Sequence, residues 1–235
     1  MRILLPLLAL SACSASVDSN AGTRSFPVPG NFDAVTLGGP DNVRVVTGGV
    51  PSIVATGETA DLDKLTVELQ GRNLIVSRKK SEGMRWGWSR NSKGVTVTVT
   101  VPRPISGAVL KGSGDLNVDQ GSGARFDAEL RGSGDLNVAR VVTQAARLSV
   151  MGSGDLKVAG QARTVAIDLT GSGGVNASGL NAETAQVGVR GSGDVDARAT
   201  RSANISLMGS GNASIRGTRN CTTSKRGSGE VRCTP

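Results

Sequence analysis

Residues 125–138 read RFDAELRGSGDLNV, and the Gly-Ser-Gly within this stretch recurs along the chain. Periodic copies begin at Gly112, Gly132, Gly152, Gly171, Gly191, Gly209 and Gly227, with spacings of 20, 20, 19, 20, 18 and 18 residues. A period near twenty, without a helix-forming stretch between copies, is typical of a β-solenoid whose rungs bury their apolar sides against their neighbours. The repeat therefore predicts a stack of coiled rungs.

Apolar residues alternate with polar ones on both sides of each Gly-Ser-Gly. Upstream, the positions four and two residues before the first glycine are apolar in every copy but the last, as in Leu148 and Val150; the last copy has Thr223 and Lys225 there. Downstream the alternation resumes, with Leu116 and Val118 facing inward and Asn117 outward. A period of two indicates strands, so each Gly-Ser-Gly is a corner between two strands. Identical corners at a fixed period predict parallel stacking in register, not hairpins.

Composition agrees with a thin solenoid core. The chain has 235 residues, 33 of them glycine, with 2% aromatic residues, no Tyr and no His. A core built from such a chain has to be narrow and aliphatic. The absence of His from the sequence excludes His-dependent triads and general bases.

One solenoid domain is expected from residue 25 to residue 235. Its regular part spans 105–235, and its irregular N-terminal part spans 25–104, where the corner Gly38-Gly39-Pro40-Asp41 is degenerate. Strands are expected there at 32–36, 43–46, 52–56, 65–68, 73–77 and 95–101. We expect this part to continue the stack with longer loops and to cap one end.

The N-terminus indicates export and a lipid anchor. An apolar run from Ile3 to Leu10 precedes Leu10-Ser11-Ala12-Cys13, the pattern of a lipoprotein signal peptide over 1–12. Cys13 is then the lipidated residue, and 13–24 forms a flexible tether. Three acyl chains, as on bacterial lipoproteins, would hold the protein stably. Ser14 resembles the outer-membrane sorting pattern, so we expect an outer-membrane lipoprotein facing the periplasm or the surface. The alternative is a buried N-terminal strand with an incidental cysteine.

Cys221 and Cys233 flank the last corner, six residues before and six after Gly227. The equivalent positions of other rungs are apolar, as at Phe126 and Val138. In an oxidising compartment this placement favours a disulfide that staples the final rung, over two free buried thiols. Such a loop would contribute about 3 kcal/mol in the chain-entropy model.

These features resemble the auto-transporter adhesin head domains known as the GIN head domain. The residues that carry the resemblance are Phe32-Asp33-Ala34-Val35, the strand Val95–Val101 ending at Pro102, and the Gly-Ser-Gly-Asp-Leu corners at Gly112 and Gly132. The resemblance covers roughly 25–235. It implies an all-β fold, a right-handed parallel β-helix with rungs of about 20 residues, on an exported bacterial protein.

Acidic residues after the corners are one candidate for chemistry. Asp115, Asp135 and Asp155 would lie at rung spacing and could bind cations. The series is broken by Gly174 and Asn212, which favours capping of turn N–H groups instead. We therefore predict no metal site. Outward asparagines such as Asn117 and Asn137 are expected to stack from rung to rung.

Catalysis has weaker support from the sequence. Outward acids and a base could cleave an acidic polysaccharide, as in some β-helix enzymes, but no spacing singles out Asp127, Glu129, Arg147 or Asp168. We predict neither an enzyme nor a cofactor. A carbohydrate-active enzyme is the alternative.

The basic charge of the chain is the other candidate for a functional feature, because it could bind a ligand. The formal net charge is +8, which attracts anionic glycans, lipopolysaccharide or an envelope protein; nucleic acid is not expected outside the cytoplasm. The densest basic and aromatic cluster contains Arg85, Trp86, Trp88 and Arg90, between two expected strands. It predicts either a ligand-binding loop or a cap in which the tryptophans pack on the solenoid end. The sequence as a whole predicts a lipid-anchored, non-catalytic module for binding, adhesion or structure in the cell envelope.

Overall fold

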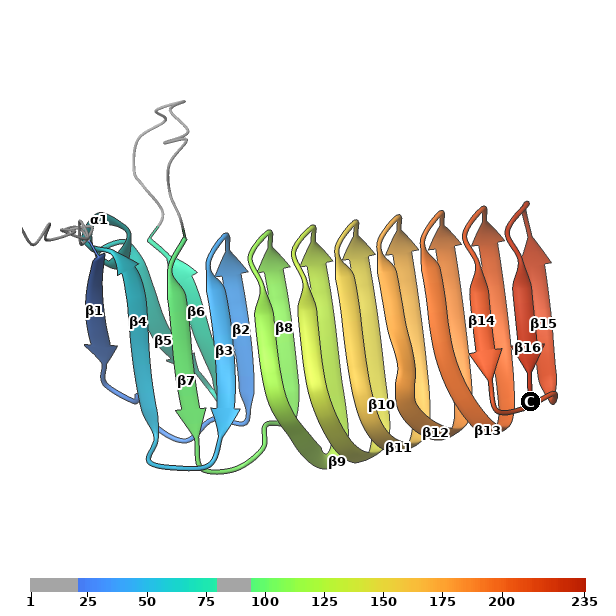
Figure 1. The fold of residues 1–235 in the computed structure, drawn as a ribbon, viewed down its shortest axis with the longest axis horizontal. Helices are drawn as coiled ribbons and strands as arrows, with labels where there is room; N and C mark the ends of the chain where they lie inside the picture. The colour runs from blue at the N-terminus through green and yellow to red at the C-terminus, as the bar shows by residue number, and fades with distance from the viewer. Residues whose placement is uncertain (1–20, 80–93) are drawn as a thin grey trace, which may run out of the picture.

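The computed structural model describes residues 21–79 and 94–235, and its strands wind into one β-solenoid (Figure 1). From β8 onward the chain ascends at the back, turns at the top and descends at the front while it advances, so the coil is right-handed (Figure 1). The sequence-based fold prediction is confirmed.

The strands form a continuous sheet that folds around the core and presents two faces, A and B. Face A contains β1 (Ala21–Phe26), β4 (Ser52–Glu58), β7 (Thr96–Val101), β3 (Asn42–Thr47), the first halves of β9 to β13, then β14 (Ala213–Arg216) and β16 (Val231–Thr234). Face B contains β5 (Leu65–Gln70), β6 (Asn73–Arg78), β2 (Ala34–Gly39), β8 (Gly107–Gly112), the second halves of β9 to β13, and β15 (Cys221–Arg226).

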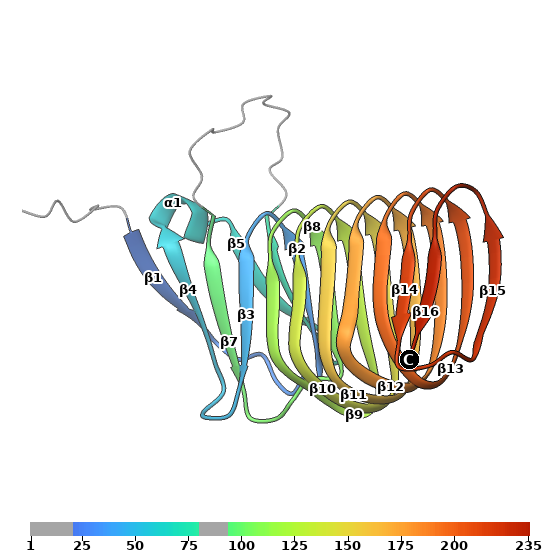
Figure 2. The ribbon, with the colours of Figure 1, turned by 45° about the vertical axis from the view of Figure 1, so that its right-hand side comes forward.

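Five long strands make the regular rungs: β9 (Leu116–Gly132), β10 (Leu136–Gly152), β11 (Asp155–Gly171), β12 (Gly174–Gly191) and β13 (Asp194–Gly209). Each leaves a Gly-Ser-Gly corner along face A, bends, and returns along face B to the next corner (Figure 2). The row of corners is called the corner edge. The opposite row, called the bend edge, consists of segments 119–125, 139–145, 159–164, 178–184, 198–202 and 216–220. Neighbouring rungs pair in parallel, with Gly132 opposite Gly112 and Gly152 opposite Gly132.

The predicted inward positions are buried. Leu116, Leu130, Leu148 and Val150 are at most 1% exposed, and their equivalents in other rungs are similarly enclosed. Each strand therefore buries the apolar side chains of one face, and together these side chains form a narrow aliphatic core along the length of the array.

Both glycines of a corner are required by how closely the rungs approach one another. Gly132 has φ +139°, and a Cβ on it would overlap the carbonyl oxygen of Gly112. A Cβ on Gly134 would overlap the carbonyl oxygen of Gly114. The Gly112 carbonyl accepts hydrogen bonds from the N–H groups of Ser133, at 3.0 Å, and Gly134, at 3.2 Å. The central serine has no such restriction.

A further Gly-Ser-Gly, at 121–123, falls outside the period and lies in the bend of β9. Here the reason is different. A Cβ on Gly121 would overlap the ring of Phe126, whose position in the next two rungs is occupied by the smaller Ala146 and Val165.

The N-terminal part forms rungs as expected, but their order in space differs from their order in sequence. The β6/β7 rung lies outside the β2/β3 rung, which packs directly against β8 and β9. Beyond it, β4 and β5 pair antiparallel with β7 and β6, and β1 pairs antiparallel with β4. The expectation of a simply continued stack is therefore incomplete: these antiparallel strands and the short helix α1 (Thr59–Leu62) close this end.

In the structure, the strands of the domain begin earlier than the predicted start at residue 25. Strand β1 begins at Ala21, so 21–24, expected to belong to a flexible tether, instead pair with β4. Within the described residues, no helix has the length and apolar character needed to cross a membrane.

Candidate functional site

Polar side chains after the corners bind the backbone of the next rung. Asn42 Oδ1 accepts a hydrogen bond from the Asp115 N–H at 3.1 Å. The same contact joins Asp194 Oδ1 to the Asn212 N–H, at 2.8 Å, and Asn212 Oδ1 to the Glu230 N–H, at 3.0 Å. Of the three acids predicted to cap turn N–H groups, Asp135 accepts from the Asp155 N–H through Oδ1 at 3.4 Å. An amide or a carboxylate can serve as the acceptor in this column.

The outward asparagine column makes a weaker contact. Asn137 Nδ2 donates to Asn117 Oδ1 at 3.5 Å, and the next residue in this column is Lys157. Among the described residues, no three His, Cys, Asp or Glu side chains gather to hold a metal ion.

The only buried ionic cluster that the described residues show lies between the N-terminal rungs. Asp41, from the degenerate corner, is fully buried and accepts two hydrogen bonds from Arg78, from Nη2 at 2.6 Å and from Nε at 2.8 Å. Arg78 Nη1 also lies 3.1 Å from Asp61 Oδ1, which Lys64 Nζ contacts at 3.0 Å. The hydrogen bond with Asp41 raises the pKa of Arg78, the charges of both carboxylates add to this effect, and burial opposes it.

This cluster holds both ends of the segment that contains the tryptophans. Arg78 ends β6, and the N–H of Val95, just before β7, donates to Asp41 Oδ1 at 3.0 Å. The predicted site residues Arg85, Trp86, Trp88 and Arg90 lie outside the described residues, so their role stays a prediction. The same holds for Cys13.

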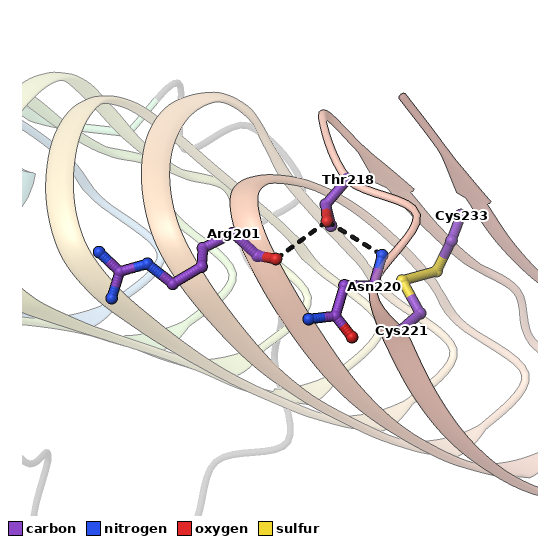
Figure 3. Close-up of a disulfide and its surroundings, with 5 residues drawn as sticks. All are labelled: Arg201, Thr218, Asn220, Cys221 and Cys233. Atoms are coloured by element: carbon purple, nitrogen blue, oxygen red, sulfur yellow. Dashed lines mark hydrogen bonds between the residues drawn. A yellow bond between two sulfur atoms is a disulfide. The ribbon is translucent and has the colours of Figure 1, made fainter.

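The predicted disulfide between Cys221 and Cys233 is present (Figure 3). It joins β15 to β16 with a Cα–Cα distance of 6.6 Å, and both cysteines pack against the end of the core. Nearby, Thr218 Oγ1 donates to the Arg201 carbonyl and accepts from the Asn220 N–H, both at 3.1 Å (Figure 3). These contacts fix the path of the chain into the final rung.

The final rung needs such support because its side chains cover the core poorly. Thr223 and Lys225 pair with the buried Ile205 and Leu207 but are themselves exposed. Lys225 Nζ donates to the Gly229 carbonyl at 2.9 Å, which holds the charge over the solenoid end. A charge pointing inward on a terminal strand opposes edge-to-edge aggregation.

The outer surface of face B carries a shallow groove of about 710 Å³ that follows the solenoid axis. It crosses the rungs from β9 to β15. Equivalent positions of successive rungs form one column of its lining, made of Arg125, Ala145, Thr164, Thr184, Ser202 and Asn220. Arg147 lies in the neighbouring column, two residues further along its strand. This column was not among the predicted site residues, although alignment of the rungs after their bends shows the small polar residues Thr164, Thr184, Ser202 and Asn220 in register.

The acids considered for catalysis lie on this same face, and each is ion-paired. Asp127 lies 2.8 Å from Arg125, Asp168 lies 3.9 Å from Arg147, and Glu129 pairs with Arg131. The Asp127 and Asp168 side chains are 50% and 49% exposed. Both carboxylates are therefore half-exposed and already have an arginine partner. The arrangement suits binding of polar groups.

The chain matches the profile of a known family over residues 31–219, described as "Putative auto-transporter adhesin, head GIN domain". The matched part reaches from β2 to the segment before β15. No curated protein matches the chain.

Solved structures share the fold. A "putative adhesin" from Bacteroides fragilis is 25% identical, with a TM-score of 0.82 over 92% of this chain and 97% of that one. A "putative lipid binding protein" from Parabacteroides distasonis is 19% identical, with a TM-score of 0.69 over the same shares. A "putative adhesin" from Parabacteroides merdae is 16% identical, with a TM-score of 0.70 and the same coverage.

Proposed function

Because the chain belongs to the auto-transporter adhesin head (GIN) domain family, we propose that it is a non-catalytic adhesion module of the cell envelope, held at the outer membrane by lipid on Cys13. The proposal rests on one observation: each rung has one set of residues that packs the solenoid and another set that faces outward. Corner glycines, inward aliphatic residues and the disulfide all serve packing. The outward positions form long polar columns that a ligand can contact on several rungs at once.

The family and the similar structures are named as adhesins, which supports a role at the cell surface. The Parabacteroides protein named for lipid binding has the same fold, and the proposed anchor places this chain beside lipid as well. A repeat array suits multivalent contact, in which many weak contacts add up over the length of the solenoid.

Lipidation is tested by labelling cells with an alkyne analogue of palmitate and fractionating their envelopes. We expect the wild-type chain to carry label and to sediment with outer membranes, whereas Cys13→Ala should lose both properties. Ser14→Ala is the matched control and should retain label. Unlabelled wild-type protein in the soluble fraction would contradict the anchor.

Adhesion is tested separately, by measuring binding of the purified full chain to isolated envelopes and by screening neutral and acidic polysaccharides for cleavage. We expect saturable binding and no new reducing ends. Release of oligosaccharides by the wild-type chain, lost in Asp168→Asn, would support the carbohydrate-active alternative instead.

A further inference from the structure

The bend edge differs from the rest of the surface in its charge. Its six segments contain seven arginines and two acids: Arg125, Arg140, Arg163, Arg198, Arg201, Arg216 and Arg219, with Asp119 and Glu183. All seven arginines are exposed. These seven residues are called the arginine edge.

Both acids on this edge are already engaged. Asp119 accepts hydrogen bonds from the N–H and Oγ1 of Thr47, both at 2.7 Å. Glu183 pairs with Arg201 at 2.6 Å. Within residues 21–79 and 94–235, no ion pair involves Arg140, Arg163, Arg198, Arg216 or Arg219. The edge therefore presents positive charge that the described residues leave uncompensated.

The corner edge is balanced by comparison. Lys111, Arg190 and Arg226 precede their corners, and Asp115, Asp194 and Glu230 follow them. The basic excess of the described array is thus concentrated on the bend edge. Charges at a rung spacing of about 4.8 Å act together on a ligand that runs along the axis.

The groove of face B lies directly beside this edge. Arg163, Arg201 and Arg219 immediately precede the groove-lining Thr164, Ser202 and Asn220 in the chain, and Arg125 lines the groove itself. Gln186 and Asn204 extend the polar lining across the strands. Hydroxyl and amide groups match the hydroxyls of sugars, and guanidinium groups match carboxylate, sulfate or phosphate.

We propose that the groove of face B and the arginine edge together bind a linear anionic polysaccharide that lies along the solenoid axis. This inference rests on the proposed adhesive function and names its ligand class. Sugar hydroxyls contact the small polar column, while acidic groups of the polymer meet arginines of successive rungs. From β9 to β15 the site is about six rungs long, or about 29 Å, so a polymer gains contacts that a single sugar lacks.

A membrane surface fits this edge less well than a glycan does. Among the exposed large apolar residues of the described chain, only Val142 belongs to the bend-edge segments, and interfacial binding requires a set of inserted apolar side chains. In addition, β1 begins at the corner-edge side of the other end of the solenoid (Figure 1). The described chain therefore begins on the side opposite the arginine edge.

The experiment measures binding of the full chain to polygalacturonate, dextran sulfate and neutral dextran, at low and high salt. We expect binding to both acidic polymers, weakened by salt, and none to neutral dextran. The bend-edge variant Arg163→Gln/Arg198→Gln/Arg219→Gln should lose at least about tenfold in affinity, because three charge-assisted contacts are removed. The corner-edge variant Lys111→Gln/Arg190→Gln/Arg226→Gln removes the same net charge and should change affinity less than about twofold.

A second variant tests the groove without changing charge. Thr184→Trp places an indole in the middle of the groove and should weaken polymer binding by obstruction, with little effect on the urea midpoint because the side chain points outward. Equal losses in the two charge variants would overturn the assignment, since they would indicate attraction by net charge alone. Binding to phosphatidylglycerol vesicles but not to the polymers would overturn it in favour of a membrane. If envelope binding persists while both polymers fail to bind, the ligand class is wrong and the adhesive function stands.

Discussion

The two edges of the solenoid are built under different constraints. At the corner edge each rung approaches the previous one so closely that Gly132 and Gly134 leave no space for a Cβ. At the bend edge the pairing between neighbouring rungs shifts register, as between Val138 and Val141, and the bends differ in length and composition. One edge is therefore repetitive because it is sterically fixed, and the other is free to carry charge.

The largest effect is expected where that steric constraint is tightest. Gly134→Ala should destabilise the protein by about 4 kcal/mol, because the new Cβ overlaps the Gly114 carbonyl and the rungs have to separate. Urea unfolding followed by circular dichroism measures the change. Ser133→Ala in the same corner is the control and should stay within about 0.5 kcal/mol. A near-neutral Gly134→Ala would show that the corners tolerate displacement.

A substitution in the degenerate corner should destabilise the protein nearly as much, because it removes a buried charge and not because it introduces a steric overlap. Asp41→Ala leaves Arg78 with only the Asp61 contact, removes the acceptor of the Val95 N–H, and should cost about 3 kcal/mol, measured as above. The exposed pair between Arg24 and Asp63 provides the control, since Asp63→Asn should change stability by less than about 0.5 kcal/mol.

The pH dependence of this cluster follows from the raised pKa of Arg78. A group whose pKa is higher in the folded state stabilises the fold at every pH below its ordinary value, and the contribution is lost only as pH rises through the raised value. The loss in the free energy of unfolding caused by Asp41→Ala should therefore be the same at pH 7 and pH 9. A deficit that fades between these values would mean that Arg78 is not the charge that Asp41 stabilises.

The disulfide should have a smaller effect that is confined to one end. Cys221→Ser/Cys233→Ser is expected to lower stability by about 2 to 3 kcal/mol and to increase hydrogen exchange in β15 and β16 before β9 to β11. Hydrogen exchange with mass spectrometry resolves the two regions. Uniform loosening along the whole array would contradict the role as an end staple.

The polar column after the corners should contribute about 1 kcal/mol for each contact. Asn212→Ala removes the acceptor of the Glu230 N–H and the partner of Asp194, so its urea midpoint should fall accordingly. Asn204→Ala, on the outer surface of face B, is the matched amide deletion and should leave the midpoint unchanged. Equal effects would show that the column does not act through rung-to-rung capping.

The smallest effect on stability is expected at the bend edge. Arg163→Gln removes an exposed charge and should change the free energy of unfolding by less than about 0.5 kcal/mol. A loss comparable to that of Gly134→Ala would remove the distinction between the two edges, since the arginine would then hold the fold as well as attract a ligand.

Much of the regular array could be predicted from sequence, because alternation and a fixed period are local properties. Leu148, Val150 and their equivalents were predicted to face inward, and the cysteine pair was predicted from its place in the repeat. The candidate surface was harder to predict. The groove depends on which side chains become neighbours across rungs, and the arginine edge depends on which irregular segments share one side.

Strand alternation and the glycines that a close turn requires are visible in the sequence, and they establish that the chain coils, where its corners lie and which side chains fill the core. Three features arise only in the folded molecule: the β6/β7 rung lies outside the β2/β3 rung, Asp41 contacts both Arg78 and Val95, and arginines from successive bends form one edge. The physical reason is that pairing between strands distant in sequence is chosen by packing and buried charge, which no local pattern records.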